Sequence, residues 1–147
     1  MQLRDYQMAS IKDLQNKYET LDEKLAMEHE DAVKAELLMA FNYEYSGSDT
    51  SVSIDTSEFT AVCPWTGLPD FGSIYIKYVP DKLCIELKSL KYYLMTYTKV
   101  GIVQEHAANK ILEDLIRCCN PISMTVDLDY KVRGGIHTSI TCNYKKP

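Results

Sequence analysis

The sequence predicts an α+β domain in which an antiparallel sheet is backed by two helices. Apolar and polar residues alternate over 74–79 and 124–130, which is typical of strands with one buried face. Between 102 and 118 apolar residues recur every three or four positions, as in a helix that buries one face. With their neighbours, these segments follow the order strand-strand-helix-helix-strand-strand. The 147 residues, 46% hydrophobic and 25% charged, suit one domain with at most a short appendage.

Residues 1–30 are predicted to form a helical extension before the domain of residues 31–147. Over 4–30 the apolar residues are spaced alternately three and four positions apart: Ile11, Leu14, Tyr18, Leu21 and Leu25. This spacing makes an apolar seam of about two heptads, which is too short to be stable alone. The seam suits a helix that packs on the domain and a coiled coil with a partner about equally well.

Four elements are predicted in the first half of the domain: a helix over 32–41, then strands over 52–62, 74–79 and 83–87. The loop of residues 63–70 separates the first two strands. Pro80 and Asp81 turn the chain between the last two strands, which are therefore expected to pair as a hairpin.

Two helices and two strands are predicted in the second half: 88–97, 102–118, 124–130 and 136–144. Pro121 ends the longer helix, because proline cannot continue the hydrogen-bond ladder. The buried face of that helix is expected to be aliphatic: Ala108, Ile111, Leu112, Leu115 and Ile116. Gly134 and Gly135 turn the chain between the last two strands, which form a second hairpin.

The distribution of charge argues against a nucleic-acid partner. The net charge is −5, and residues 1–36 carry nine acidic against five basic side chains, so the rest of the chain is nearly neutral. The Lys/Arg-rich stripe that duplex nucleic acid requires is missing. No apolar run approaches the ~20 residues that span a bilayer, and no secretion signal is recognisable. We expect a cytoplasmic protein with no direct nucleic-acid or membrane partner.

The five cysteines form no CxxC pair and have no zinc-ligand spacing, so neither a disulfide framework nor a metal site is expected. Four of them fit as small buried apolar residues: Cys84, Cys118, Cys119 and Cys142. Cys63 differs, because it opens a loop that contains two prolines and a glycine and ends at Asp70. A carboxylate that folds back toward a partly exposed thiol can exchange its proton, although Asp70 could equally serve as a turn residue.

Two further clusters carry charge at the starts of the predicted helices. Lys88 and Lys91 stand three positions apart, so both ammonium groups can reach one anion, although a solvated basic face is the commoner role for such a pair. Gln104, Glu105 and His106 place an imidazole beside a carboxylate, and this imidazole could titrate near neutral pH. Neither glycine-rich phosphate-binding fingerprint occurs, so side chains would have to hold the phosphates of a nucleotide cofactor.

Three segments, in order, resemble the signatures of one known family: 59–70, 86–93 (Glu-Leu-Lys-Ser-Leu-Lys-Tyr-Tyr) and 133–136. They are similar to the NADPH-dependent nitrile reductases that convert 7-cyano-7-deazaguanine to 7-aminomethyl-7-deazaguanine in queuosine biosynthesis. The resemblance covers roughly residues 37–147. It implies the tunnelling fold, whose subunits join their sheets edge to edge into homo-oligomeric rings. Such rings stack in pairs and hold active sites between subunits.

The resemblance also implies a role for each residue that matches the family's motifs. Cys63 is expected to attack the nitrile carbon and form a covalent thioimide, while Asp70 moves the proton. The positions expected to bind the deazapurine substrate are Glu86, Leu87, Ser89 and Glu105. The positions expected to bind the phosphates of NADPH are Lys88, Lys91 and Arg133.

The sequence departs from the family pattern at two places. Gln104 stands where the family commonly has a histidine, and His106 could take over its protonation role as a catalytic residue. Adjacent positions on a helix point about 100° apart, however, so this substitution is not geometrically equivalent. Thr98 and Lys99 replace a common Arg-Asn pair, which implies altered cofactor binding or compensation by Lys99.

Two other functions stay open. A related amidinotransferase forms the same thioimide on tRNA, but those relatives lack the lysine-rich motif around Lys88. A non-catalytic purine-binding protein would have no need of both Cys63 and Asp70.

Overall fold

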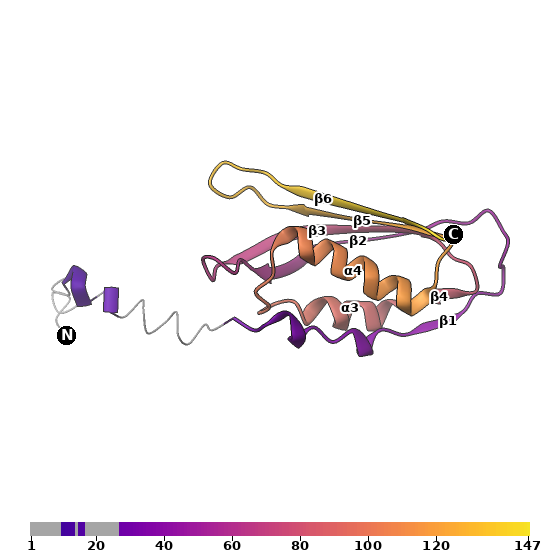
Figure 1. Cartoon of the computed structure of the whole chain (residues 1–147), viewed down its shortest axis with the longest axis horizontal. Helices are drawn as coiled ribbons and strands as arrows, with labels where there is room; N and C mark the ends of the chain where they lie inside the picture. The colour runs from indigo at the N-terminus through magenta and orange to yellow at the C-terminus, as the bar shows by residue number, and fades with distance from the viewer. Residues whose placement is uncertain (1–9, 14, 17–26) are drawn as a thin grey trace, which may run out of the picture.

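Two helices, α3 (Leu87–Met95) and α4 (Gln104–Cys119), cover one face of a four-stranded antiparallel sheet (Figure 1). The strands lie in the order β2 (Val52–Val62), β3 (Pro69–Val79), β5 (Ser123–Tyr130) and β6 (Ser139–Lys145). A two-stranded sheet pairs β1 (Ala40–Asn42) with β4 (Leu83–Ile85), and two 3₁₀ turns precede it, η1 (Glu30–Ala32) and η2 (Ala35–Leu37). This computed structural model describes residues 10–13, 15–16 and 27–147.

The core lies between the sheet and the helices. Strand alternation sends every second side chain of β5 into it: Met124, Val126, Leu128 and Tyr130, each at most 3% exposed. The predicted apolar face of α4 is buried through Ala108, Ile111, Leu112 and Leu115, whereas Ile116 is only partly buried. For the main sheet the predicted order strand-strand-helix-helix-strand-strand is confirmed, with β2 and β3 before the helices and β5 and β6 after them, whereas β1 and β4 form a separate sheet.

The predicted hairpin between 74–79 and 83–87 is wrong. Strand β3 has β2 on one side and β5 on the other, so both of its hydrogen-bonding edges are occupied. The chain after Asp81 instead crosses to the helix side of the sheet, where the Ile85 N–H donates to the buried hydroxyl of Tyr78 at 3.0 Å. There β4 pairs with β1, and the first hairpin of the main sheet joins β2 to β3.

The helix predicted over 32–41 is also wrong, because this segment forms η2 and the start of β1. It lies along α3, whose hydroxyl side chains bind its backbone. The Met39 N–H donates to Ser89 Oγ at 3.0 Å, and the Lys34 N–H donates to Thr96 Oγ1 at 3.3 Å. These long-range hydrogen bonds, together with the pairing of β1, take the place of the local bonds that an α-helix would make.

Most of the predicted N-terminal helix, including Leu14, Tyr18, Leu21 and Leu25, lies outside the described residues. Residues 11–13 and 15–16 are helical, as predicted. Glu28 is not helical. Its N–H donates to Lys99 O at 2.7 Å and its carbonyl accepts from the Gly101 N–H at 2.8 Å, so it belongs to the folded body. Along the described part of the chain, no helix is long and apolar enough to cross a membrane.

Candidate active site

The loop between β2 and β3 carries the Cys63 thiol. Two backbone hydrogen bonds close this loop: the Cys63 N–H donates to Leu68 O at 2.9 Å, and Cys63 O accepts from the Gly67 N–H at 2.8 Å. Gly67 has a φ of +73°, in the left-handed region that favours glycine. The loop is therefore a tight turn that holds a half-buried cysteine at the end of β2.

Val62, the last residue of β2, fixes the loop against the helix layer. Its N–H donates to Val100 O at 2.9 Å, and its carbonyl accepts from the Ile102 N–H at 3.1 Å. Because Ile102 lies just before α4, these two bonds bring the first turn of α4 beside Cys63.

Asp70 faces the same pocket as Cys63. It is the second residue of β3, opposite Ala61 of β2, and is only 5% exposed. The pocket has a volume of about 300 Å³ and is walled by the Cys63 loop, the start of α4 and the β5–β6 hairpin. Its other lining residues include Trp65, Gln104, Glu105, Lys131, Arg133 and Ile136. The structure thus brings the predicted nucleophile and the predicted proton carrier together.

Hydrogen bonds within the loop favour the thiolate of Cys63. Partial burial raises the pKa of this thiol and the charge of Asp70 does the same, but hydrogen bonds from the Thr66 side chain and from the backbone of Thr66 and Trp65 lower it. The net effect is a pKa below that of an ordinary cysteine. Burial raises the pKa of Cys118, Cys119 and Cys142. The surroundings of Cys63 therefore favour the thiolate more than those of the other three cysteines do.

We expect the Thr66→Val protein to alkylate more slowly at Cys63. The substitution removes a hydrogen bond to the thiolate, so the pKa of Cys63 rises and the reactive fraction at neutral pH falls. The rate with iodoacetamide at pH ~7 should drop about threefold or more, and its pH profile should move to higher pH. Thr66→Ser keeps the hydroxyl and serves as the control. A Thr66→Val profile that matches the wild-type profile would contradict this assignment.

Arg133 also belongs to this pocket. Its guanidinium forms an ion pair with Asp70, and its Nη2 donates to Thr66 Oγ1 at 3.3 Å. The β5–β6 turn that carries it contains Gly134 and Gly135, with φ of +57° and +78°. Arg133 was expected beside Lys88 and Lys91 at the phosphates of a cofactor, but within one chain the structure does not bring these three residues together.

At the start of α4, the structure brings Gln104 and Glu105 into the pocket but not His106. His106 is exposed and points elsewhere, because each residue of a helix is turned by about 100° from its neighbour. The expectation that His106 replaces the usual histidine at Gln104 therefore has no support from the geometry of this chain.

A second group of predicted site residues lies at the start of α3. Glu86 caps this helix: its carboxylate accepts from the Ser89 N–H at 2.7 Å and from the Lys88 N–H at 2.9 Å, and these bonds lower the pKa of Glu86. Leu87 is 60% exposed, and Lys88 and Lys91 are exposed beside it. Ser89 is buried, and its hydroxyl donates to Glu86 O at 2.8 Å. Ser89 thus holds the start of the helix in place.

The two groups lie toward opposite ends of α3. Helix α3 begins beside β4 and runs toward the end of the sheet where the Cys63 loop and α4 begin (Figure 1). Its nine residues span about 13 Å. Leu87 and Lys91 line a different pocket, of about 470 Å³, between α3 and strands β2 and β3. Within one chain, the two groups of predicted site residues therefore line different pockets.

Several residues that line the Cys63 pocket were not predicted as site residues, among them Trp65, Lys131 and Thr138. Trp65 lies in the predicted loop, and its position two residues after Cys63 is a usable signal. Lys131 and Thr138 carry no local signal. They reach the pocket only because the β5–β6 hairpin folds over the end of β3, where the Lys131 N–H donates to Phe71 O at 2.9 Å.

Comparisons with known proteins agree with the motifs. A family model described as QueF-like protein matches residues 69–147. The NADPH-dependent 7-cyano-7-deazaguanine reductase of Chloroherpeton thalassium is 48% identical over 113 residues, which is 77% of this chain and 97% of the relative. The protein of the same name from Chlorobaculum tepidum is 49% identical over 111 residues, which is 76% of this chain and 95% of the relative.

Among solved structures, the apo form of the archaeosine synthase QueF-Like superposes with a TM-score of 0.63 and covers 68% of this chain and 98% of its own. At 20% identity this likeness shows the fold alone, and it confirms the predicted α+β tunnelling fold. The identities to the two reductases are high and extend over nearly their whole length. The chain therefore belongs to the QueF-like family, together with the 7-cyano-7-deazaguanine reductases to which it is similar.

Proposed function

We propose that this protein reduces the nitrile of 7-cyano-7-deazaguanine to the aminomethyl group of 7-aminomethyl-7-deazaguanine with NADPH, in queuosine biosynthesis. The observation that carries the proposal is the Cys63 thiol, whose lowered pKa and position beside Asp70 suit attack on a nitrile. The identity of about half of the aligned residues to enzymes of that name supports it. We expect the reaction to take place in the cytoplasm and without direct contact to nucleic acid, since the domain lacks a basic stripe.

The first step is the formation of a thioimide. The sulfur of Cys63 bonds to the nitrile carbon, one π bond of the C≡N group opens, and the proton that leaves the sulfur reaches the nitrogen through Asp70. The resulting C=N bond carries sulfur and is easier to reduce than the nitrile. When bound, NADPH would supply two hydrides in succession, and between them the C–S bond would break so that Cys63 leaves as the thiolate.

Lys88 and Lys91 fit the phosphates of that cofactor. They project from the first turns of α3, three positions apart on one face. Among the described residues, neither makes an ion pair, so both charges are available to an anion. Lys99 lies at the other end of the helix and does not join them.

The Cys63 pocket and the start of α3 each carry a carboxylate that suits the N–H edge of the deazapurine, which resembles guanine. Glu105 lines the Cys63 pocket, and Glu86 lies at the start of α3. Each carboxylate oxygen of Glu86 already accepts one backbone N–H, yet each has a further lone pair for the substrate.

The separation of the two groups supports an active site that is shared between subunits. Strands β2 and β6 are the outer strands of the main sheet, and their free edges can pair with neighbouring copies. Apolar side chains stand exposed around the Cys63 pocket, with Trp65 83% and Ile136 70% exposed. We propose a homo-oligomeric ring, paired with a second ring, in which α3 of one subunit faces the Cys63 pocket of the next.

The function is tested by mixing the purified protein with 7-cyano-7-deazaguanine and NADPH and following cofactor oxidation. Consumption of two NADPH per nitrile supports the proposal. A thioimide adduct without oxidation would favour the amidinotransferase, and neither adduct nor oxidation would favour a purine-binding protein without catalysis.

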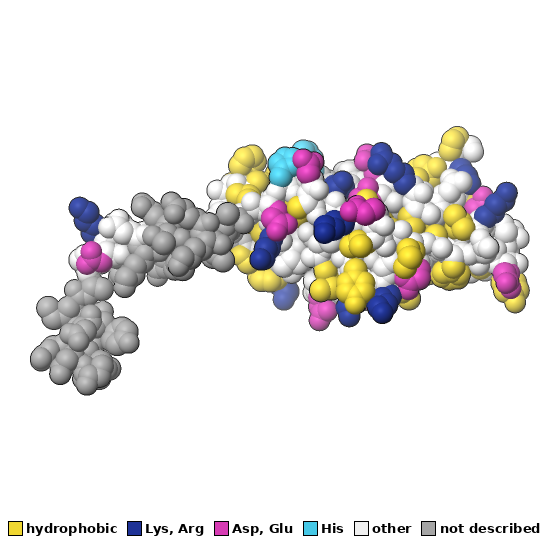
Figure 2. Space-filling view, turned by 90° about the horizontal axis from the view of Figure 1, so that it is seen from below, with side chains coloured by type: hydrophobic (Ala, Val, Ile, Leu, Met, Phe, Trp, Pro, Cys, Tyr) yellow, Lys and Arg dark blue, Asp and Glu magenta, His cyan; other side chains and the backbone are white. Residues whose placement is uncertain are grey.

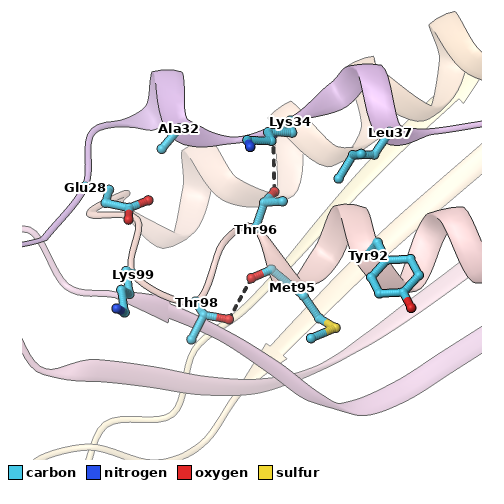
Figure 3. A pocket seen from close by; sticks show the side chains of 9 residues that line it. All are labelled: Glu28, Ala32, Lys34, Leu37, Tyr92, Met95, Thr96, Thr98 and Lys99. Atoms are coloured by element: carbon cyan, nitrogen blue, oxygen red, sulfur yellow. Dashed lines mark hydrogen bonds between the residues drawn. The ribbon is translucent and has the colours of Figure 1, made fainter.

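We further propose that residues 1–30 support assembly rather than chemistry. Glu28, near the end of this extension, lines a groove of about 560 Å³ between the segment 28–37 and α3 (Figure 3). Leu37, Tyr92 and Met95 line it and are 38%, 48% and 56% exposed. Figure 2, which views this side of the molecule, shows hydrophobic side chains gathered near its centre with Lys and Arg around them. We propose that the predicted apolar seam, whose last residue Leu25 lies three positions before Glu28 in the sequence, covers this groove.

Removal of residues 1–26 should lower the melting temperature by roughly 5 °C or more while leaving turnover nearly unchanged. The truncation ends before Glu28 because that residue hydrogen-bonds to Lys99 and Gly101. Calorimetry, light scattering and turnover of the truncated protein check this. Leu21→Ala, in the seam, should reproduce part of the loss, and Thr20→Ala, outside it, should not. Unchanged melting with lost turnover would place the extension in the active site instead.

A further inference from the structure

The guanidinium of Arg133 spans two residues that flank the Cys63 thiol. Its Nη1 forms the ion pair with Asp70, and its Nη2 donates to Thr66 Oγ1 at 3.3 Å. Asp70 is the proposed proton carrier, and Thr66 is the residue whose hydrogen bonds stabilise the thiolate. One side chain from a distant hairpin therefore contacts both groups on which the reactivity of Cys63 depends.

The backbone that carries Arg133 is well anchored. Arg133 and Ile136 exchange two backbone hydrogen bonds, of 3.0 Å and 2.9 Å, across the turn. Two residues earlier, the Lys131 N–H donates to Phe71 O, next to Asp70 on β3. The Arg133 side chain is 37% exposed, whereas that of Asp70 is 6% exposed. The carboxylate of the ion pair is therefore buried, and the guanidinium is partly open to solvent. A planar guanidinium can hold both partners at once, which an ammonium cannot do with the same geometry.

We propose that Arg133 is a positioning residue for the covalent step: it holds the Asp70 carboxylate and the Thr66 hydroxyl in place around Cys63. This role rests on the proposed function and differs from a role in binding the cofactor phosphates. It acts when sulfur adds to the nitrile carbon and the proton passes to nitrogen, a step that requires no NADPH. Its loss should therefore be visible without the cofactor.

The same contacts predict an effect on the thiol itself. Without Arg133 the charge of Asp70 near the sulfur loses its counter-ion, and the Thr66 hydroxyl loses a donor that orients it. Both changes disfavour the thiolate, so the pKa of Cys63 rises. A residue that merely stabilised the hairpin would leave this titration unchanged.

The test compares Arg133→Ala, Arg133→Lys and the wild type in two assays without NADPH. The first follows adduct formation with 7-cyano-7-deazaguanine by mass, and the second follows the pH dependence of Cys63 alkylation by iodoacetamide. For Arg133→Ala we expect adduct formation to slow about tenfold or more and the alkylation profile to move to higher pH. Arg133→Lys keeps the positive charge but lacks the planar guanidinium with its two donor nitrogens, so it should recover part of the rate. Arg117→Ala, an exposed arginine near the far end of α4, is the matched control.

Wild-type adduct formation and an unshifted alkylation profile in Arg133→Ala, with only the KM for NADPH raised, would overturn the proposal. A melting curve of each variant identifies any loss of folding, and in that event Arg133→Lys decides between the two roles by the same criteria. If the wild-type protein forms no adduct at all, the proposed function fails. The alkylation profile still tests Arg133 in that case.

Discussion

Cys63→Ala is expected to abolish nitrile reduction while leaving the fold and the assembly intact. The thiol makes the only covalent bond to the substrate in the proposed reaction, so turnover should fall by about 10³-fold or more. Structural damage should be small, because Cys63 holds its loop through backbone atoms that alanine retains. Cys63→Ser should be equally inactive, since a hydroxyl lacks the acidity of the thiol.

Mass spectrometry separates loss of the nucleophile from loss of binding. Incubation with the nitrile and without NADPH should add one substrate mass to the wild-type chain and none to Cys63→Ala. Cys118→Ala is the matched control, because burial raises the pKa of that half-buried thiol and no role is proposed for it. An adduct that persists in Cys63→Ala would place the nucleophile elsewhere.

The second large effect concerns the sharing of the active site. A Cys63→Ala chain and a Lys88→Glu/Lys91→Glu chain should each be inactive alone. If each site combines the Cys63 pocket of one subunit with α3 of its neighbour, randomly mixed oligomers should recover about a quarter of the wild-type activity. Co-expression with two different tags and purification over both tags yields the mixed oligomers whose turnover is measured.

Two substitutions within the same pocket provide the control for this experiment. Cys63 and Glu105 line the same pocket of one chain, so mixing Cys63→Ala with Glu105→Ala should restore nothing. If doubly tagged oligomers of Cys63→Ala and Lys88→Glu/Lys91→Glu stay inactive, the result contradicts a shared site. In that case α3 and Cys63 of the same chain would have to form the site.

The local pattern of apolar residues was sufficient to predict the helices and strands that bury one face. The alternation along 124–130 predicted β5 almost to its ends, and the spacing of aliphatic residues predicted the buried side of α4. The partner of β4 could not be predicted in the same way, because alternation identifies a strand but not the strand beside it. The backbone of 32–41 is held by hydroxyl groups 50 and 62 positions away in the chain, and no local propensity contains that information.

The same limit applies to the candidate site: contacts within one loop could be predicted, and contacts between distant segments could not. Cys63 and Asp70 are seven positions apart on one turn, so their meeting could be predicted from the loop. Arg133 lies 63 positions from Asp70, and nothing in its own neighbourhood indicates which acid it contacts. The motif around Lys88 was recognised by resemblance, but its distance from Cys63 within the chain depends on the direction of α3, which the motif does not determine.

The two backbone hydrogen bonds of Val62 fix one wall of the pocket. They lock the thiol-bearing strand and the start of α4 into a single unit. The opposite wall is a hairpin that turns on two glycines and exposes Val132 and Ile136. During the proposed reaction the attacked carbon changes from linear to trigonal to tetrahedral, so the bound molecule bends twice without leaving. The wall fixed by Val62 can keep the sulfur beside the carbon while the geometry of that carbon changes, until the C–S bond breaks.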